Sequence, residues 1–395
     1  MPRSMLLRRT PADPADWFGP EELEESRRYQ KPLRRLRLVE SAFGAAVLLA
    51  FVAGDAAPDL LDAFDLERGW VLQLAVVVAA LSLVGLVYEH WFSAYGDLVY
   101  DRRWGLSTQT VQGWLSDQVK NLVVGWVFLT LVLVPVYAVI RSTDLWWLYA
   151  WLVFMALQVV FAFLVPVVLL PIFNKFTPME PGELRSRIEA VAERAGVEIE
   201  GIYVMDASRR TRRDNAFVAG LGKTRRVVLF DTMLEYPPET IEHVVAHEIG
   251  HYRLHHIAKS IPIIGALTLS AFVFLKLVSG WDGLLEWAGV DDIGDPAAVP
   301  LFLLGFGVAT KATSLLQAWH VRYKEREADL EALELLRDPE AMVELWRTMG
   351  PKNKADLDPS WWARLNHDHP EFAERMAFAR RWQELAADSR LVHPR

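Results

Sequence analysis

The chain has no cysteine among its 395 residues. This absence excludes disulfide bonds, cysteine nucleophiles and thiolate ligands, so any bound metal must be held by histidine, aspartate or glutamate. Charge of one sign is missing locally, because residues 280–298 include five acidic side chains but no lysine or arginine. Apolar residues are abundant: 52% of the chain is hydrophobic and the mean hydropathy is +0.14, which is high for a soluble protein.

Six apolar stretches could cross a bilayer, which takes about 17–25 helical residues. The first is short, contains Glu40 and follows a long charged arm, which favours an uncleaved anchor over a signal peptide. The fourth contains Pro166 and Pro171, so a kink or tilt is expected there. The six stretches are residues 38–54, 69–92, 122–140, 145–173, 260–279 and 299–319.

Basic and acidic residues lie in different loops. Lysine and arginine are concentrated in the arm at 1–37 and in the loop after the second stretch, whereas the loops after the first and fifth stretches are acidic. Because positively charged loops stay in the cytoplasm, both termini are expected there. Six crossings then place segment 174–258 and the tail 320–395 on the same cytoplasmic side of a multi-pass cell-membrane protein.

A histidine-rich helix in segment 174–258 has the spacing of a zinc site. His247 and His251 are four residues apart, so they share one face of a helix and can bind one zinc ion together. Glu248 follows the first of them and is placed to act as a general base. Three further histidines of this region are expected at the surface or behind the ligands, namely His243, His255 and His256.

The segment just after the sixth stretch offers a third ligand. Glu325 and Asp329 are four residues apart, and Arg322 lies on nearly the same face. Glu325 would complete a catalytic zinc site, Asp329 would orient one of the imidazoles from behind, and Arg322 is expected behind the ligands as well. The alternative is a helix with ordinary surface charges, as expected for Glu327. Cobalt or manganese would fit the same ligand atoms, and zinc is chosen by ligand type.

Short strands are expected at 199–206, 215–219 and 225–231, after a turn at 174–178 and a helix at 182–195. Asn215, Ala216 and Phe217 begin the middle strand, which is our candidate for an edge that holds a substrate by main-chain pairing. An ordinary strand would have the same sequence pattern.

A basic cluster surrounds these strands. We interpret it as solvated loops that also fix the topology, with contact to anionic lipid headgroups or a substrate carboxylate as the alternative. Nucleic acid is not an expected partner, because no recognised binding module accompanies the charge. The cluster comprises Arg209, Arg210, Arg212, Arg213, Lys223, Arg225 and Arg226.

The sequence therefore predicts a mainly α, multispanning helical membrane protein with a small α+β, zincin-like cytoplasmic domain. The expected parts are a cytoplasmic arm at 1–37, four membrane helices in 38–173, a domain with the zinc helix at 174–258, two membrane helices in 259–319, and a cytoplasmic part with the third ligand at 320–395.

From about residue 95 to its end, the chain resembles the type-I CAAX prenyl proteases. Residues 100–110 (YDRRWGLSTQT) resemble the cytoplasmic loop of that family, and residues 173–178 (FNKFTP) resemble its signature after a span. The zinc motif, the spacing of Glu325 and Asp329, and the pair His369-Pro370 followed by Arg375 match as well.

The resemblance implies a barrel of membrane helices around a water-filled chamber, closed at one end by a peptidase domain. It implies that His247, His251 and Glu325 bind one zinc ion and that Glu248 is the general base and then acid. His369 would steady the oxyanion and Arg375 would buttress the site. Asn215 would hold the substrate backbone.

Three functions are compatible with these patterns. The first is a zinc metalloendopeptidase of CAAX type that cleaves lipidated or membrane-proximal peptides, with membrane lipids as further partners. The second is a quality-control metalloprotease that degrades misfolded membrane proteins. The third is a non-catalytic transporter or scaffold, for which mid-span charges would be the sign. Lys276 and Lys311 lie near span ends or can snorkel, which disfavours this third function.

Overall fold

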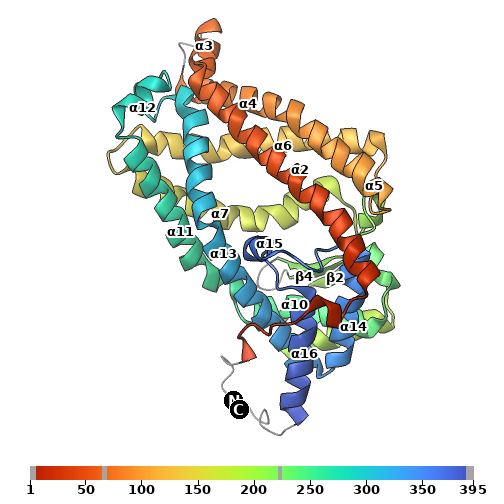
Figure 1. Ribbon diagram of the computed structural model, residues 1–395. Helices are drawn as coiled ribbons and strands as arrows, with labels where there is room; N and C mark the ends of the chain where they lie inside the picture. Colours follow the sequence, from red (N-terminus) through yellow and green to blue (C-terminus); the bar gives the residue numbers. More distant parts are fainter. Residues whose placement is uncertain (1–5, 65–68, 221–224, 388–395) are drawn as a thin grey trace.

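The computed structural model of the chain describes residues 6–64, 69–220 and 225–387. Long apolar helices form one part, and a small sheet with several helices forms the other (Figure 1). This arrangement confirms the predicted class.

Among the described residues, five helices are long and apolar enough to cross a membrane, or six if a bent pair counts as one span. They coincide with the six predicted stretches. The bent pair turns by 42° near Pro166, as the two prolines of this stretch led us to expect. The spans are α2 (Pro20–Ala53), α4 with η2 and α5 (Trp70–Ser93, Ala94–Tyr100 and Asp101–Arg103), α6 (Val111–Ile140), the bent pair α7 with η3 and α8 (Trp146–Leu164, Val165–Leu169 and Leu170–Phe173), α11 (His256–Val278), and η7 with α13 (Pro296–Ala298 and Val299–Leu336).

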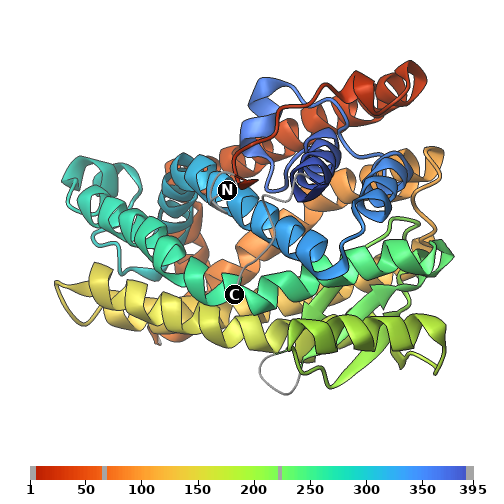
Figure 2. The ribbon, with the colours of Figure 1, turned by 90° about the horizontal axis from the view of Figure 1, so that it is seen from below.

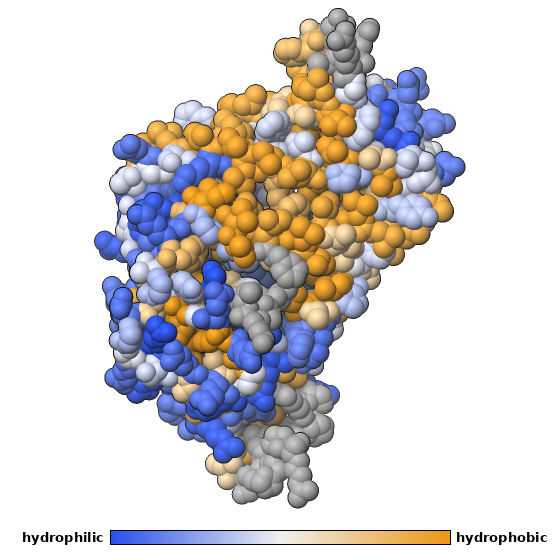
Figure 3. Space-filling view, turned by 180° about the vertical axis from the view of Figure 1, so that it is seen from behind, coloured by the Kyte–Doolittle hydropathy of each residue, from blue (hydrophilic) through white to orange (hydrophobic). Residues whose placement is uncertain are grey.

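The outer faces of these helices suit a lipid environment. Large apolar side chains remain exposed along them, including Leu38, Val87 and Leu277. Figure 3 shows an apolar band across one face of the molecule, with hydrophilic side chains on either side of it. Such a band exceeds what a soluble monomer exposes, so a bilayer accounts for it.

The membrane helices surround a cavity and converge at one end. A cavity of about 550 Å³ lies among α2, α4, α6 and α13. Glu40, Glu89 and His90 line it, so these ionisable side chains of the spans face the interior, as such groups do in membrane proteins. At the far end, Tyr137, Phe272 and other buried apolar residues close the bundle, together with α3 (Ala56–Ala63) and α12 (Asp282–Trp287).

The α+β domain is built on a four-stranded sheet with the order β1-β2-β4-β3. The parallel pair β2 and β4 lies at the centre, and β1 and β3 are antiparallel edges. Three strands lie where the sequence predicts them. The prediction of a turn at 174–178 is partly wrong, because Phe176–Pro178 forms a strand that pairs with β2. Proline is tolerated in this strand because the strand lies at the edge of the sheet. The strands are β1 (Phe176–Pro178), β2 (Gly201–Met205), β3 (Ala216–Ala219) and β4 (Arg226–Phe230).

Helices pack around this sheet and bury one continuous apolar core. The predicted helix at 182–195 is α9 (Glu183–Ala195), which ends at Gly196 with φ 65°, a left-handed conformation that suits glycine. The other helices of this part are η4 (Ala207–Arg209), η6 (Asp231–Glu235), α10 (Pro238–Arg253), α14 (Pro339–Lys352), α15 (Trp361–Asn366) and α16 (Phe372–Ala387).

The N-terminal arm belongs to this core. Leu6, Leu7 and Phe18 are buried in it, and η1 (Pro14–Asp16) contacts α16. Figure 2 shows the arm passing α16 on its way to the start of α2. Helix α2 begins at Pro20 and continues without a break into the first span, so the arm joins the two parts of the molecule.

Arginines of the basic cluster also join the two parts. Arg210 pairs with Asp117 and Arg213 pairs with Asp101, both at 2.8 Å or less. The solvated-loop interpretation is therefore wrong for these two, because each finds a carboxylate on a membrane helix. Arg209, Arg212 and Arg226 are exposed, Arg225 is half-buried, and Lys223 lies outside the described residues.

Candidate metal centre

The two histidines of the zinc motif lie on α10. Pro238 starts this helix at a position where its missing N–H costs no hydrogen bond. Apolar neighbours such as Val245 and Ile249 bury the helix against α9 and α13. It ends before His255, whose φ of 55° breaks the helical path, and α11 starts at His256. The motif is thus one short turn from a membrane span.

Glu325 lies on helix α13, beside the two histidines of α10. Helix α13 starts in the membrane part and continues to Leu336 without a break. Glu325 Oε2 lies 3.3 Å from His247 Nε2, and Glu325 Oε1 lies 3.3 Å from His251 Nε2. The two imidazole Nε2 atoms are 3.1 Å apart. The three side chains therefore meet although 74 residues separate the second from the third.

These distances fit a tetrahedral zinc ion. Bonds of about 2.0–2.2 Å at tetrahedral angles hold ligand atoms roughly 3.3–3.6 Å apart. The observed separations of 3.1 and 3.3 Å are close to this value. His247, His251 and Glu325 form the one group of this kind found in the described ranges. Three protein ligands of this kind would leave a fourth position for water, as catalytic zinc sites do.

Side chains behind the ligands hold them in place. Asp329 Oδ1 lies 2.9 Å from His247 Nδ1. Arg375 donates to both oxygens of Asp329, at 2.9 and 2.5 Å. Its guanidinium lies 3.5 Å from the ring centroid of Trp346. His247 is therefore fixed from the side opposite to the ligand cluster.

His251 has a partner of its own. His256 Nδ1 lies 2.9 Å from His251 Nδ1, and its Nε2 lies 3.3 Å from Glu327. His256 is 4% exposed, so it lies behind the ligands and not at the surface. Glu327 also accepts from Lys324, which contradicts the expectation that it points to solvent. His243 is 1% exposed and is likewise not a surface group.

Charges around the site shift the pKa values of its groups. Burial lowers the pKa of His247, but hydrogen bonds with Asp329 and Glu325 outweigh burial and raise it to about 9. Burial raises the pKa of the Glu248 carboxyl, and the neighbouring imidazoles oppose that shift. A carboxyl with a raised pKa beside two imidazoles is suited to take up and return a proton.

His369 lies at the open side of this cluster. Its Nδ1 is 2.8 Å from Glu325 Oε2, and its side chain is 61% exposed. The hydrogen bond with Glu325 raises the pKa of His369. Arg322 does not contact a ligand or Asp329, in contrast to the expectation. It donates to the carbonyl oxygens of Leu365 and His367, so it holds the segment that leads to His369.

The candidate substrate strand is an edge of the sheet. β3 pairs with β4 on one side, and the described residues contribute no strand to its other side. Phe230 N donates to Asn215 O, so the backbone groups of Asn215 and Phe217 face β4. Ala216 and Val218 therefore present their backbone groups to the free edge, where the Val218 carbonyl oxygen accepts from Tyr252 Oη at 3.4 Å. The Asn215 side chain lies there too, because its Oδ1 accepts from Ala216 N.

The structure brings together these residues that the sequence predicts for the site: the three candidate ligands, Glu248, Asp329, His369 and Arg375. The prediction missed the contributions of Trp346, which stacks on Arg375, and of Lys324, which pairs with Glu327. No local pattern marks Trp346, since its role depends on packing between α10, α14 and α16.

Two family models match successive parts of the chain. The model for "CAAX prenyl protease N-terminal, five membrane helices" matches residues 3–175, and that for "Peptidase family M48" matches residues 178–383. The similarity thus begins at residue 3, earlier than the expected residue 95.

Individual relatives agree with this. The chain is 27% identical to an uncharacterised metalloprotease, YhfN, of Bacillus subtilis, over 94% of this chain and 88% of the relative. It is 29% identical to CAAX prenyl protease 1 of Saccharomyces cerevisiae, over 62% of this chain and 57% of that protein.

A solved structure shares the fold. The crystal structure of S. mikatae Ste24p superposes with a TM-score of 0.83 at 24% identity, over 95% of this chain and 93% of that one. This similarity confirms the helical chamber with a small sheet domain.

The family models cover most of the chain, and M48 peptidases are zinc-dependent metalloproteases. The match argues against a non-catalytic transporter or scaffold. The chain therefore belongs to peptidase family M48, as a multi-pass membrane zinc metalloprotease of the CAAX prenyl protease type.

Proposed function

We propose that His247, His251 and Glu325 hold one zinc ion and that the site hydrolyses peptide bonds of lipidated or membrane-proximal substrates. The meeting of the three side chains carries this proposal, because one ligand atom from each lies within 4.8 Å of the other two. Zinc in this site would lower the pKa of a bound water toward about 7 and polarise a substrate carbonyl.

The protein's own groups then perform the proton transfers. Glu248 takes a proton as water attacks the carbonyl carbon and returns it to the leaving amine as the C–N bond breaks. His369, which is exposed beside Glu325, donates a hydrogen bond to the developing oxyanion. Arg375 keeps Asp329 ionised and in place, and Asp329 fixes the ring of His247.

Substrate binding is assigned to the free edge of β3. An extended peptide would pair with Ala216, and the amide of Asn215 would contact the peptide backbone, while the half-buried Phe217 would contact peptide side chains. Main-chain pairing holds the scissile bond in place and depends little on sequence, so specificity must come from elsewhere in the molecule.

The location of the site favours substrates near the membrane. His251 is five residues from the start of α11, and Glu325 is six residues beyond the exposed Trp319 of α13, which is about 9 Å of helix. The basic residues of the arm support a cytoplasmic location for this end of the molecule. A peptide anchored in the cytoplasmic leaflet by a lipid would reach the site without leaving the membrane.

The test is product analysis by mass spectrometry on a peptide panel, with and without a zinc chelator. A prenylated peptide with a C-terminal CAAX sequence, the same peptide without the lipid, and an unfolded membrane protein form the panel. We expect chelator-sensitive cleavage of the prenylated peptide. Cleavage of the unfolded protein alone would favour the quality-control function instead.

Metal analysis tests the ligand set separately. Glu325→Ala removes one of three ligands, so the purified variant should lose most of its zinc. Glu344→Ala, which removes an exposed glutamate of α14 that accepts only from Thr348 among the described residues, is the control and should keep its zinc. Equal zinc content in the two variants would reject Glu325 as a ligand.

A further inference from the structure

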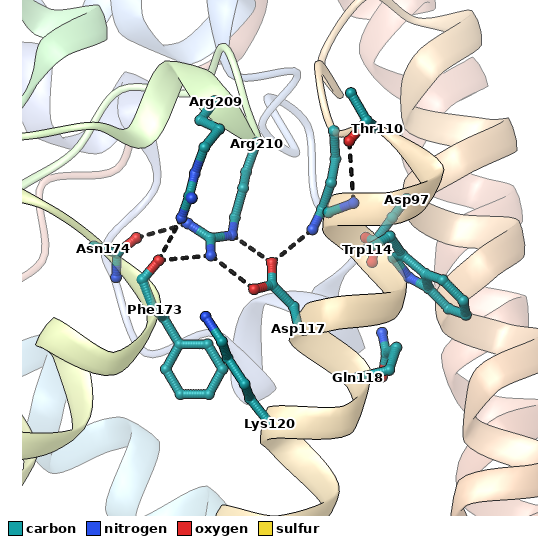
Figure 4. Close-up of polar contacts among 12 residues, drawn as sticks. Asp97, Thr110, Trp114, Asp117, Gln118, Lys120, Phe173, Asn174, Arg209 and Arg210 are labelled. Carbon is teal, nitrogen blue, oxygen red and sulfur yellow. Dashed lines mark hydrogen bonds and ion pairs between the residues drawn. The ribbon is translucent and has the colours of Figure 1, made fainter.

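Two signature segments of the chain take no part in the chemistry described above. They are residues 100–110, between α4 and α6, and residues 173–178, after α8. In the structure, both segments meet at one side chain, Arg210, which follows η4 and comes five residues before Asn215 (Figure 4).

Arg210 uses its whole guanidinium. Nε and Nη2 donate to the two oxygens of Asp117 on α6, at 2.7 and 2.9 Å. Nη1 donates to Asn174 Oδ1 at 3.0 Å, and Nη2 also donates to the carbonyl oxygen of Phe173 at 2.6 Å. The Arg210 and Asp117 side chains are 20% and 14% exposed, and a bidentate pair shielded from water is stronger than a surface pair.

Asp117 joins the first signature segment to this pair, because it accepts from Gln109 Nε2 at 2.8 Å. The backbones of the two loops also pair. Thr108 N donates to Arg210 O at 3.0 Å, and Arg212 N donates to Leu106 O at 2.8 Å. Residues 106–109 and 208–212 therefore form one joint between the membrane helices and the peptidase domain.

The chain between this joint and β3, the candidate substrate strand, is short and restrained. Asp214 is held at both its backbone and its side chain. Its N–H donates to Asn353 Oδ1 at 2.9 Å, and Lys352 Nζ donates to its carboxylate at 3.0 Å. Only four residues separate Arg210 from Asn215. A shift of Arg210 relative to α6 would therefore be passed on to the start of β3.

We propose that Arg210 is a positioning residue that sets the free edge of β3 at a fixed place relative to the membrane helices. The inference rests on the proposed function, in which the peptide pairs with β3 while its lipid remains in the membrane. Two linked contacts reinforce each other only when their sites have the right separation. A fixed joint thus favours lipidated peptides over the same peptides without lipid.

The experiment compares kcat/KM for a prenylated peptide with that for its unlipidated counterpart, in full-length protein. Arg210→Gln should lower the ratio about tenfold, which corresponds to about 1.4 kcal/mol. Asp117→Asn should act alike, and the double variant should be no worse than either single one. Arg212→Gln is the matched control, because Arg212 is exposed and has no side-chain polar contact among the described residues.

Zinc content and the thermal midpoint establish that each variant is folded. An unchanged ratio in folded Arg210→Gln protein would overturn the proposal, and so would an equal loss on both peptides, which would mean a general effect on the active site.

Amide hydrogen exchange measures the rigidity of the joint and of β3 without any substrate. The amides of Thr108, Arg212 and β3 should exchange faster in Arg210→Gln protein than in Arg212→Gln protein. If the unaltered chain cleaves neither peptide, the proposed substrate class fails, and this exchange measurement alone then decides whether Arg210 fixes β3. Equal exchange in the two variants would reject the joint.

Discussion

Arg375 holds Asp329 with two parallel hydrogen bonds, from Nε and Nη2, at a place where both side chains are buried. Asp329 in turn lies 2.9 Å from the outer nitrogen of His247. A lysine would keep the charge but lose the planar pair of donors. The orientation of His247 therefore depends on the shape of the guanidinium as well as on its charge.

Arg375→Lys should accordingly lower zinc affinity by about 10–100-fold, the usual effect of disturbing a group behind a metal ligand. Competition with a zinc-binding dye measures this. Arg380→Lys is the control, because Arg380 lies on the same helix but forms an exposed pair with Glu340. Equal zinc affinity in the two variants would show that Arg375 does not act through His247.

Glu248→Gln should keep zinc and lose cleavage. The amide is nearly isosteric but cannot take a proton, and general base catalysis contributes about 10²–10⁴-fold in rate. Zinc analysis and single-turnover cleavage of the same preparation measure the two properties. Glu239→Gln, at the exposed start of the same helix, should keep both. Cleavage at the normal rate by zinc-loaded Glu248→Gln protein would exclude Glu248 as the base.

The local part of this site could be predicted from the sequence. A four-residue spacing puts His247 and His251 on one helical face whatever the rest of the fold does. Glu325 and Asp329 obey the same rule, and apolar length marks the spans. Each of these signals lies within one element.

Contacts between distant elements could not be predicted in this way. The stacking of Trp346 on Arg375 and the pairing of β1 with β2 each depend on how separate elements pack. For Arg322 the helical position could be predicted, but its contacts could not. Its guanidinium donates to the carbonyl oxygens of Leu365 and His367, which belong to a distant segment of the chain.

His243 should make the fold sensitive to acid. Burial lowers its pKa to about 4, and neither ring nitrogen has a side-chain hydrogen-bond partner among the described residues. In the unfolded chain the pKa returns to about 6.5. Between pH 6.5 and 4 the unfolded state therefore binds the extra proton, and stability falls as the pH falls, by about 3 kcal/mol over this range.

His243→Asn should remove this part of the acid sensitivity, measured as the difference in thermal midpoint between pH 7 and pH 4.5. His255→Asn is the control, because His255 is exposed and asparagine tolerates its positive φ. The same loss of midpoint with pH in both variants would contradict the assignment to His243.

Arg9 links the N-terminal arm to the segment that carries His369 and Arg375. Its guanidinium lies 3.2 Å from Glu371 and 3.4 Å from Glu374, whose side chains are buried. Each carboxylate keeps a second arginine, Arg364 or Arg326, so Arg9→Gln should weaken the segment without unfolding it. We expect kcat to fall about twofold to fivefold, as for a partly exposed ion pair.

The exposed neighbour Arg8 supplies the control variant Arg8→Gln, which should leave kcat unchanged. If Arg9 acts by placing His369, then Arg9→Gln should have no further effect in a protein that already carries His369→Asn. Independent, multiplying losses in the double variant would mean that the arm affects catalysis by another route. The arm would then stabilise the domain as a whole, because Leu6, Leu7 and Phe18 would still anchor it in the core.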